Sequence, residues 1–369
     1  MTSLDFSSLR RWPDIEEENL FAYDATDRLL LDLATPLIEG AEVVTIGDGY
    51  GALTIGALQL GATSVRAHQD SLVGELALAA NASSGDAFQN LPLGSELLAG
   101  ATLVLLQIPK SLDELEEQLA EIALHAAPEV TVIAGGRIKH LTPTMNPIMQ
   151  RYFATLDVSL AQQKSRAFTL RQPRPDAEQR FPITQLHRDL GLTLSAHGAA
   201  FAGTGIDIGT RALLGVLRKV GPLGGVAIDL GCGTGVLAAS IAQQRPGLRV
   251  IATDQSAAAV ASATETMQLN GLSDRVEVVR DDGLVSQPDS SADVILLNPP
   301  FHIGAVVHTG PAHRMFTDAA RVLKPGGELW TVFNTHLGYR QALQRIVGPT
   351  DLVTHNDKFT VTITRKPVR

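Results

Sequence analysis

Apolar runs of strand length alternate with amphipathic segments of helix length along the whole chain. This alternation favours parallel sheets covered by helices. In the second half, the predicted strands are Val226–Leu230, Arg249–Thr253, Val276–Arg280, Val294–Leu297, Glu328–Phe333 and Lys358–Thr364. The predicted helices are Leu237–Gln244, Ala257–Leu269, His313–Leu323 and Tyr339–Val347. The third of these helices should end before the Pro-Gly-Gly at positions 325–327, because that tripeptide stops a helix.

The two halves of the chain repeat one pattern. Residues 45–51 (TIGDGYG) align with residues 229–235 (DLGCGTG), and the same offset relates Asp70 to Asp254. The segment 131–170 also has the order of strand, turn, helix and strand found in 331–364. The sequence therefore predicts an α/β protein of two tandem Rossmann-like domains related by duplication. Each domain should have a mostly parallel sheet with helices on both faces.

A segment rich in proline and charge separates the two halves. Pro173, Pro175 and Pro182 lie between Leu170 and Arg188, where no periodicity is sustained. Such a composition is typical of a linker. We therefore predict one domain over residues 1–180 and a second over residues 181–369.

Composition limits the class of protein. With 369 residues, 44% apolar and 19% charged, the chain is too long for one average domain and too apolar to be disordered. No basic start precedes an apolar block, no apolar run reaches a membrane-spanning length, and Cys232 alone cannot form an internal disulfide. We expect a cytoplasmic protein without a membrane partner. The oligomeric state stays open.

The net charge of −9 argues against non-specific wrapping of nucleic acid, because Lys and Arg supply most of that affinity. Any nucleic-acid contact must then come from local basic clusters, although ordinary solvated faces look the same in sequence. Two such clusters are present: Arg137, Lys139 and His140 in one, and Lys164, Arg166, Arg171, Arg174 and Arg180 in the other.

A glycine-rich loop follows the first predicted strand of the second half. Gly231, Gly233 and Gly235 follow Asp229 and precede a predicted helix, where glycine lets the backbone turn tightly and approach a ligand. Such loops serve many ligands. A dinucleotide fingerprint requires Gly or Ala at the position of Val236, so a nicotinamide cofactor is disfavoured.

Two further carboxylates follow the next two predicted strands. Asp254 could accept both hydroxyls of a ribose, although it could instead cap the following helix. Asp282 could accept from an adenine amino group, or it could only form a turn. A glycine loop and acids at successive strand ends together favour an adenosine-bearing ligand at the sheet edge.

The fourth predicted strand ends in Asn298-Pro299-Pro300-Phe301. Two prolines cannot donate to a sheet ladder, so the chain must leave the sheet there. The Asn298 side-chain oxygen and the Pro299 carbonyl can accept the two hydrogens of an exocyclic amine, which frees its lone pair to attack a methyl group. Phe301 would stack on a flipped base. A plain turn with Phe301 in the core is the alternative.

The single cysteine and the histidines offer little further chemistry. Cys232 lies inside the glycine turn, where a small filler is favoured over a nucleophile. His302, His308, His313 and His336 lack metal-ligand spacing with acids or cysteines, so we predict no metal site.

With these motifs, the sequence resembles class I methyltransferases, and among them the tandem-domain bacterial rRNA guanine-N2 methyltransferases. The resemblance covers essentially the whole chain. Residues 298–302 look like the catalytic motif of that family, and residues 201–209 look like the segment that helps to enclose its cofactor. Residues 334–339 and 356–359 are more similar to the large-subunit (23S rRNA) members than to the small-subunit (16S rRNA) members.

The resemblance implies that S-adenosylmethionine is the cofactor and the N2 amine of a guanine in rRNA the substrate. Asn298, Pro299, Pro300 and Phe301 would then be catalytic. The implied cofactor-binding residues are Asp229, Gly231, Gly233, Gly235, Asp254 and Asp282. Methylation of adenine N6 or of protein glutamine N5 by the same motif stays open, as does a catalytically silent RNA-binding or assembly factor.

The first half departs from this motif set. Thr45 stands at the position of Asp229, and Gln107-Ile108-Pro109-Lys110 replaces the motif at 298–301. The resemblance implies that this degenerate half supports the catalytic domain and assists RNA recognition.

Overall fold

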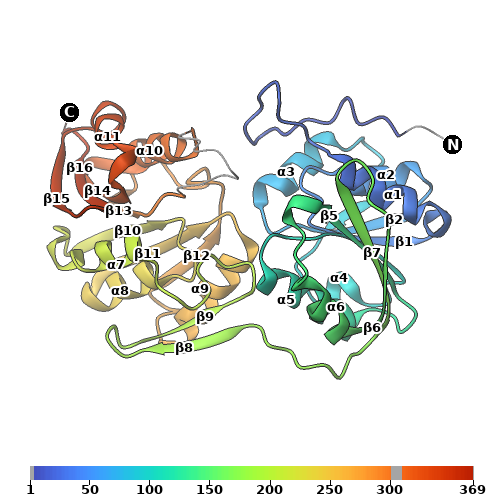
Figure 1. The fold of residues 1–369 in the computed structure, drawn as a ribbon. Helices are drawn as coiled ribbons and strands as arrows, with labels where there is room; N and C mark the ends of the chain where they lie inside the picture. Colours follow the sequence, from blue (N-terminus) through green and yellow to red (C-terminus); the bar gives the residue numbers. More distant parts are fainter. Residues whose placement is uncertain (1–3, 301–309, 369) are drawn as a thin grey trace. The chain divides into compact units, whose positions relative to one another are not determined.

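The computed structural model describes residues 4–300 and 310–368. The chain divides into two compact units, residues 1–181 and 182–369 (Figure 1). The last strand of the first unit runs to Pro173, and the first strand of the second begins at Ile183. The irregular connection is therefore shorter than the linker predicted between Leu170 and Arg188, because the sheet continues through the first of the three prolines.

The N-terminal unit is built on one seven-stranded sheet. Its helices are α1 (Ala25–Ile38), α2 (Ala52–Gln59), α3 (Leu72–Asn81), α4 (Ser95–Leu98), α5 (Leu112–His125) and α6 (Met145–Tyr152). Its strands are β1 (Glu42–Ile46), β2 (Ser64–His68), β3 (Phe88–Asn90), β4 (Leu103–Gln107), β5 (Thr131–Arg137), β6 (Phe153–Val158) and β7 (Ser165–Pro173). The order is β3-β2-β1-β4-β5-β7-β6, with β7 antiparallel to β5 and β6 and the other pairs parallel.

The C-terminal unit has a seven-stranded sheet and a separate hairpin. Its helices are α7 (Ile208–Leu214), α8 (Val236–Gln244), α9 (Ala257–Leu269), α10 (Gly310–Val322) and α11 (Arg340–Ile346). The hairpin strands are β8 (Ile183–His187) and β9 (Leu192–Ala196). The sheet strands are β10 (Gly224–Leu230), β11 (Gly247–Asp254), β12 (Val276–Arg280), β13 (Ala292–Leu297), β14 (Leu323–Asn334), β15 (Thr350–His355) and β16 (Phe359–Arg365).

The two large sheets have the same topology. The C-terminal order is β12-β11-β10-β13-β14-β16-β15, so each strand has a counterpart at the same place in the N-terminal sheet. In both sheets the antiparallel strand second from one edge is the last in sequence. The predicted tandem Rossmann-like fold is confirmed, and the shared order supports the predicted duplication.

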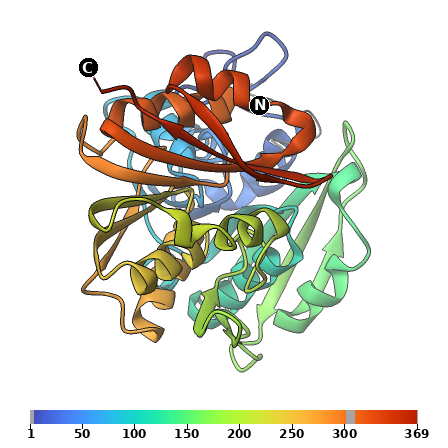
Figure 2. The same cartoon turned by 90° about the vertical axis from the view of Figure 1, so that its left-hand side faces the viewer.

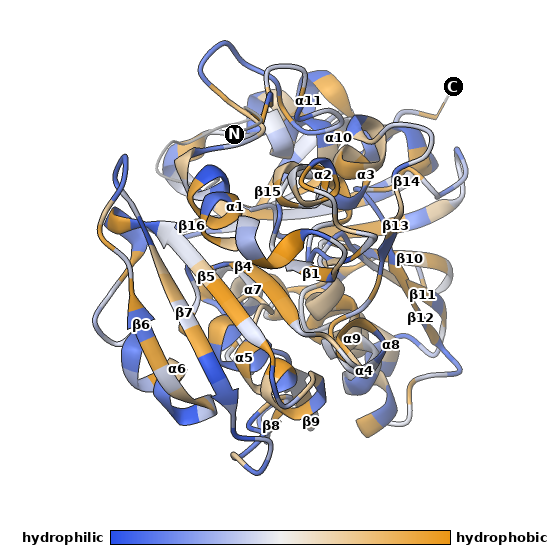
Figure 3. Cartoon of the chain, turned by 90° about the vertical axis from the view of Figure 1, so that its right-hand side faces the viewer, coloured by the Kyte–Doolittle hydropathy of each residue, from blue (hydrophilic) through white to orange (hydrophobic). Residues whose placement is uncertain are grey.

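Helices cover both faces of each sheet. In the C-terminal unit, one apolar core packs α7, α8 and α9 against the sheet, and another packs α10 and α11 against the opposite face (Figure 2). In the N-terminal unit, α4, α5 and α6 cover one face while α1 and α2 cover the other. Figure 3 shows the apolar strands β1, β4 and β5 in the middle of this sheet. Strands buried on both faces read as continuous apolar runs, which is the pattern that predicted parallel sheets in both halves.

All six strands and all four helices predicted for the second half are present, β12 and α9 with the predicted bounds and the others with shifted ends. The prediction missed β8, β9, β15 and α7. The edge strand β15 is mostly exposed, and its pairing shifts register between Leu352 and Thr354, so it has no regular apolar alternation. Helix α7 is only seven residues long. Among the described residues, no helix is long and apolar enough to cross a membrane.

Candidate active site

The predicted site residues of the C-terminal unit come from loops at one edge of its sheet. Strand β10 pairs with β11 and with β13 in parallel, and Leu230 lies opposite both Thr253 and Leu297. The chain therefore leaves these three strands at the same level. This carboxyl edge is where open α/β sheets bind ligands.

The glycine loop between β10 and α8 is tightly folded. Gly231, Gly233 and Gly235 all have positive φ, at 74°, 53° and 79°. A Cβ on Gly235 would also lie 3.1 Å from the Cβ and 3.3 Å from the Cα of Ala263, which adds to the preference of this φ for glycine. The backbone N–H groups of Gly231 and Cys232 donate to the Thr253 carbonyl at 2.8 and 2.9 Å, which ties the loop to the end of β11.

Asp229 is fully enclosed beneath this loop. Its Oδ2 accepts from the backbone N–H of Ala238 in α8 at 2.9 Å. Its Oδ1 is buried and has no hydrogen-bond partner among the described residues. Burial raises the pKa of Asp229 to about 7, and the nearby Asp254 charge adds to this rise. A buried carboxylate oxygen without a donor is costly unless a ligand supplies the hydrogen bond.

Asp254 lies at the end of β11 and holds the neighbouring backbone. Its Oδ2 accepts from the N–H of Gly233 at 3.0 Å, and its Oδ1 accepts from the N–H of Ser256 at 3.0 Å. Ser256, and not Asp254, caps α9, since its side chain accepts from Ala259. The cap alternative for Asp254 is therefore wrong in detail, although the residue does stabilise the turn before the helix.

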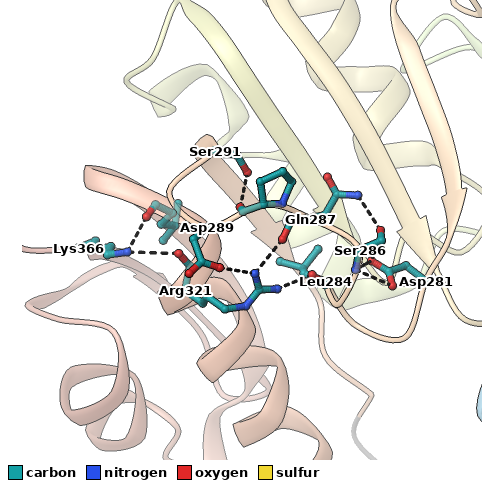
Figure 4. Close-up of polar contacts among 10 residues, drawn as sticks. Asp281, Leu284, Ser286, Gln287, Asp289, Ser291, Arg321 and Lys366 are labelled. Atoms are coloured by element: carbon teal, nitrogen blue, oxygen red, sulfur yellow. Dashed lines mark hydrogen bonds and ion pairs between the residues drawn. The ribbon is translucent and has the colours of Figure 1, made fainter.

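The acids after β12 have separate environments. Asp281 is buried and accepts from the backbone and hydroxyl of Ser286, which closes the turn (Figure 4). Asp282 is partly exposed and pairs with Arg314 of α10. The predicted adenine acceptor is therefore also part of an ion pair.

The segment after this turn is attached to the end of α10. The Arg321 guanidinium donates to the carbonyls of Leu284 and Gln287 at 2.5 and 2.7 Å, and to Asp289 at 2.6 Å (Figure 4). These bonds hold in place the chain that carries Asp282.

Asn298 follows β13, and the chain leaves the sheet there as the two prolines predict. Pro299 is buried and Pro300 is exposed. The Asn298 Nδ2 donates to Asp207 Oδ2 at 3.1 Å and to Thr210 Oγ1 at 2.9 Å. Its Oδ1 is buried without a hydrogen-bond partner among the described residues. Phe301 and His302 lie outside the described residues.

Both partners of Asn298 were missed by sequence reasoning. Asp207 caps α7 by accepting from the N–H groups of Gly209 and Thr210 at 2.8 and 3.2 Å. The sequence resemblance places Asp207 only within residues 201–209, a segment similar to one that encloses the cofactor. An Asp three residues before Thr210 and followed by an Ala-Leu-Leu run is a helix N-terminus signal that could have located α7.

The corresponding edge of the N-terminal unit has different chemistry. Asp48, in the glycine loop, accepts from the N–H groups of Leu53 and Thr54 at 2.7 and 2.8 Å. Thr45 is bonded to the Thr54 hydroxyl at 2.9 Å. Gln107, at the end of β4, donates to buried Asp27 at 2.6 Å. The buried carboxylate Asp48 therefore has donors on both oxygens, unlike Asp229.

Part of the two predicted basic clusters comes together in the N-terminal unit. The Arg137 guanidinium donates to the Gln163 carbonyl at 3.2 Å, and the Ile138 N–H donates to the Lys164 carbonyl at 2.9 Å. Burial, followed by the charges of Lys110, Lys139 and Arg137, lowers the pKa of His140. We call this group the basic patch: Lys110, Arg137, Lys139, His140 and Lys164. All are exposed except the partly buried Arg137.

The other members of the second cluster lie further along the chain. Arg166 is exposed beside Lys164 at the start of β7. Arg171, towards the other end of that strand, pairs with Asp157 at 3.1 Å, and Arg180 pairs with buried Glu116 at 2.7 Å. The second cluster is therefore not one surface.

Cys232 is buried, and burial together with the Asp254 and Asp229 charges raises the pKa of its thiol well above the ordinary value. A thiolate nucleophile is disfavoured there. Within residues 4–300 and 310–368, no three His, Cys, Asp or Glu side chains are grouped as a metal site requires.

Comparisons with known proteins cover both units. A family model described as methyltransferase small domain matches residues 191–363, and one described as RLMG N-terminal domain matches residues 1–174. A solved structure of a 16S rRNA guanine-N2 methyltransferase from T. thermophilus, in complex with AdoMet and guanosine, has a TM-score of 0.74. It is 21% identical over 92% of each chain, which shows the shared tandem fold.

Curated relatives match at nearly full length. The ribosomal RNA large subunit methyltransferase G of Pseudomonas putida is 38% identical over 97% of each chain. The protein of the same name from Pseudomonas aeruginosa is 37% identical over 96% of each chain. The chain therefore belongs to the family of tandem-domain methyltransferases whose curated members are named ribosomal RNA large subunit methyltransferase G.

Proposed function

We propose that this chain transfers a methyl group from S-adenosylmethionine to the exocyclic N2 amine of a guanine in 23S rRNA. The names of its relatives support the large-subunit RNA as substrate. A reaction on ribosomal RNA also supports the predicted cytoplasmic location.

This proposal rests on the hydrogen bonds of the Asn298 side chain. Its amide nitrogen is bonded to Asp207 and Thr210, whereas its Oδ1 has no hydrogen-bond partner among the described residues. An acceptor held in this way suits an amine, which brings two donors. The buried Pro299 supplies a backbone carbonyl next in sequence as the second acceptor.

S-adenosylmethionine supplies a methyl group on a positively charged sulfur, which an amine nitrogen can attack. Two acceptors on the amine hydrogens draw the nitrogen lone pair out of conjugation with the ring. The nitrogen–carbon bond would form as the carbon–sulfur bond breaks, which would leave S-adenosylhomocysteine, and the methylated nitrogen would then lose its proton to water. Asn298 stabilises the charge that develops on this nitrogen, so no strong base is required. The role of Phe301 in stacking on the base stays a prediction.

The residues at the neighbouring strand ends fit the cofactor. The Asp229 Oδ1 would accept from the cofactor's ammonium group, which supplies the hydrogen bond that this buried oxygen lacks. The glycine loop of Gly231, Gly233 and Gly235 allows close approach. Asp254 and Asp282 would accept from ribose hydroxyls and the adenine amino group, as predicted from the sequence.

Cofactor affinity should rise with pH through the pKa of Asp229. Burial raises that pKa to about 7, so at pH 6 most of the carboxyl is protonated and is a poor acceptor for an ammonium. We expect the dissociation constant to fall roughly eightfold between pH 6 and pH 7.5 as the carboxylate forms. Calorimetry in buffers of different ionisation enthalpy measures both this change and the release of a proton. Asp229→Asn should bind the cofactor weakly, with a dissociation constant that does not vary with pH. The same pH dependence in this variant as in the wild type would contradict the role of Asp229.

We further propose that the N-terminal unit contacts the RNA through the basic patch. A flipped guanine fills the catalytic crevice, so the surrounding RNA must be bound elsewhere. The patch lies at the carboxyl edge of the degenerate sheet, where Lys110 holds the position aligned with Phe301. Lys and Arg side chains on such a surface contact phosphates. These contacts position the RNA but do not read its bases.

Label transfer tests the choice of RNA. The protein is incubated with methyl-labelled S-adenosylmethionine and equal amounts of 23S and 16S rRNA. Each RNA is offered as an unmodified transcript and in subunits from cells that lack the enzyme. We expect the labelled methyl group in 23S rRNA. Label found only in 16S rRNA would overturn the large-subunit assignment.

A further inference from the structure

We propose that Asp207 and Thr210 are positioning residues that fix the orientation of the Asn298 amide, so that its oxygen and not its nitrogen meets the substrate amine. This inference rests on the proposed function. A carboxamide can turn over by half a rotation, which exchanges an acceptor for a donor. With its nitrogen in the acceptor position, Asn298 would repel the amine that it must bind.

The contacts at the start of α7 favour one of these two orientations. Asp207 Oδ2 is a carboxylate oxygen that accepts from the Asn298 nitrogen at 3.1 Å. The Thr210 hydroxyl donates to Asp207, so its lone pairs are left to accept from the same nitrogen, at 2.9 Å. A flipped amide would put Asn298 Oδ1 against the Asp207 carboxylate, and the Thr210 hydroxyl could donate to that oxygen only by giving up its bond to Asp207. The electrostatic repulsion disfavours that arrangement.

Gly209 allows close packing around Asp207. A Cβ at position 209 would lie 3.0 Å from Asp207 Oδ1 and 3.1 Å from the Phe359 ring, both tighter than ordinary contacts, and 3.4 Å from Asn298 Oδ1. Glycine therefore lets Asp207 keep its place beside Asn298. Helix α7 supplies both of the acceptors that bind the nitrogen, and the oxygen is left without a partner among the described residues.

The N-terminal unit contains a related contact with different chemistry. Gln107 is the last residue of β4, the strand that corresponds to β13, and it donates to Asp27, three residues after the cap of α1. Thr210 is likewise three residues after the cap of α7. The hydroxyl in the active unit is thus replaced by a carboxyl in the degenerate unit. Both units therefore have a contact between the amide at the strand end and the side chain three residues after a helix cap. Of the two amides, only that of Asn298 has a buried oxygen without a hydrogen-bond partner among the described residues.

The test uses the full chain with Thr210→Val, which keeps the shape but removes the hydroxyl, and Thr210→Ser, which restores it. We expect Thr210→Val to lower kcat roughly tenfold while the KM for RNA and the cofactor dissociation constant change less than about twofold. Thr210→Ser should recover most of the wild-type kcat. Rates are divided by the concentration of cofactor-binding sites measured by calorimetry. A smaller fraction of folded protein then does not lower the measured kcat.

Asp207→Asn is the second variant, because Asn caps helices as well as Asp but has an amide that can also donate. It should lower kcat with the same unchanged affinities. Thr26→Val, at the first turn of α1, is the matched control: it removes a buried hydroxyl bonded to Ser165 and should leave kcat unchanged. Wild-type kcat in Thr210→Val, or equal losses in kcat and cofactor affinity, would overturn the inference. If the wild type itself does not methylate guanine, the proposed function fails instead.

Discussion

Replacing Asn298 with alanine should lower kcat for methyl transfer by about 10²- to 10³-fold, the usual loss when one hydrogen-bond partner of the developing charge is removed. The change removes the only side-chain acceptor that we assign to the amine. The cofactor dissociation constant should change less than about twofold, because Asn298 is bonded to Asp207 and Thr210 and is not assigned to the cofactor. Single-turnover rates at saturating RNA, together with calorimetry for the cofactor, measure both quantities.

Gln107→Ala is the matched control for this variant. Gln107 ends the corresponding strand in the degenerate unit and donates to buried Asp27, so its loss carries a similar cost in stability. It should leave kcat unchanged. An Asn298→Ala enzyme that loses cofactor affinity in proportion to kcat would contradict the assigned role.

Reversing the charge of three lysines of the basic patch should strongly weaken RNA binding. We expect the triple variant Lys110→Glu, Lys139→Glu and Lys164→Glu to raise the RNA dissociation constant at least tenfold at low salt. The slope of the logarithm of the RNA association constant against the logarithm of salt concentration should become less steep by about two to three. Each lost phosphate contact removes roughly 0.7 to 0.9 from this slope. Binding titrations at several salt concentrations measure this. The cofactor dissociation constant should not change.

The control reverses three exposed arginines outside the patch: Arg171, Arg174 and Arg249, each to Glu. The change in net charge is the same, and Arg171 and Arg249 already pair with Asp157 and Glu277. This control should lose much less affinity than the patch variant. Equal losses in both would mean that total charge, and not the patch, determines RNA binding.

Much of the C-terminal sheet could be predicted because its central strands β10, β13 and β14 carry long buried runs. Such strands read as apolar runs, and their ends carry the residues that a ligand at the sheet edge requires. The glycine loop and the pairing of Asn298 with two prolines are local signals of this kind.

The missing parts depend on contacts between distant residues. Asp207 and Thr210 meet Asn298 only because α7 packs on the sheet near the end of β13, and no local periodicity reports that. The neighbouring acids Asp281 and Asp282 are equivalent in sequence, yet one closes a turn and the other pairs with Arg314. The second basic cluster looked continuous along the chain, but the extended strand β7 separates Lys164 from Arg171.

Mass spectrometry of nucleosides from 23S rRNA, treated with the full chain and S-adenosylmethionine bearing a deuterated methyl group, tests the assigned reaction. We expect deuterated N2-methylguanosine with the wild-type protein and almost none with Asn298→Ala under the same conditions. Deuterium found instead in N6-methyladenosine or on a protein glutamine, or equal N2-methylguanosine from both proteins, would contradict this expectation.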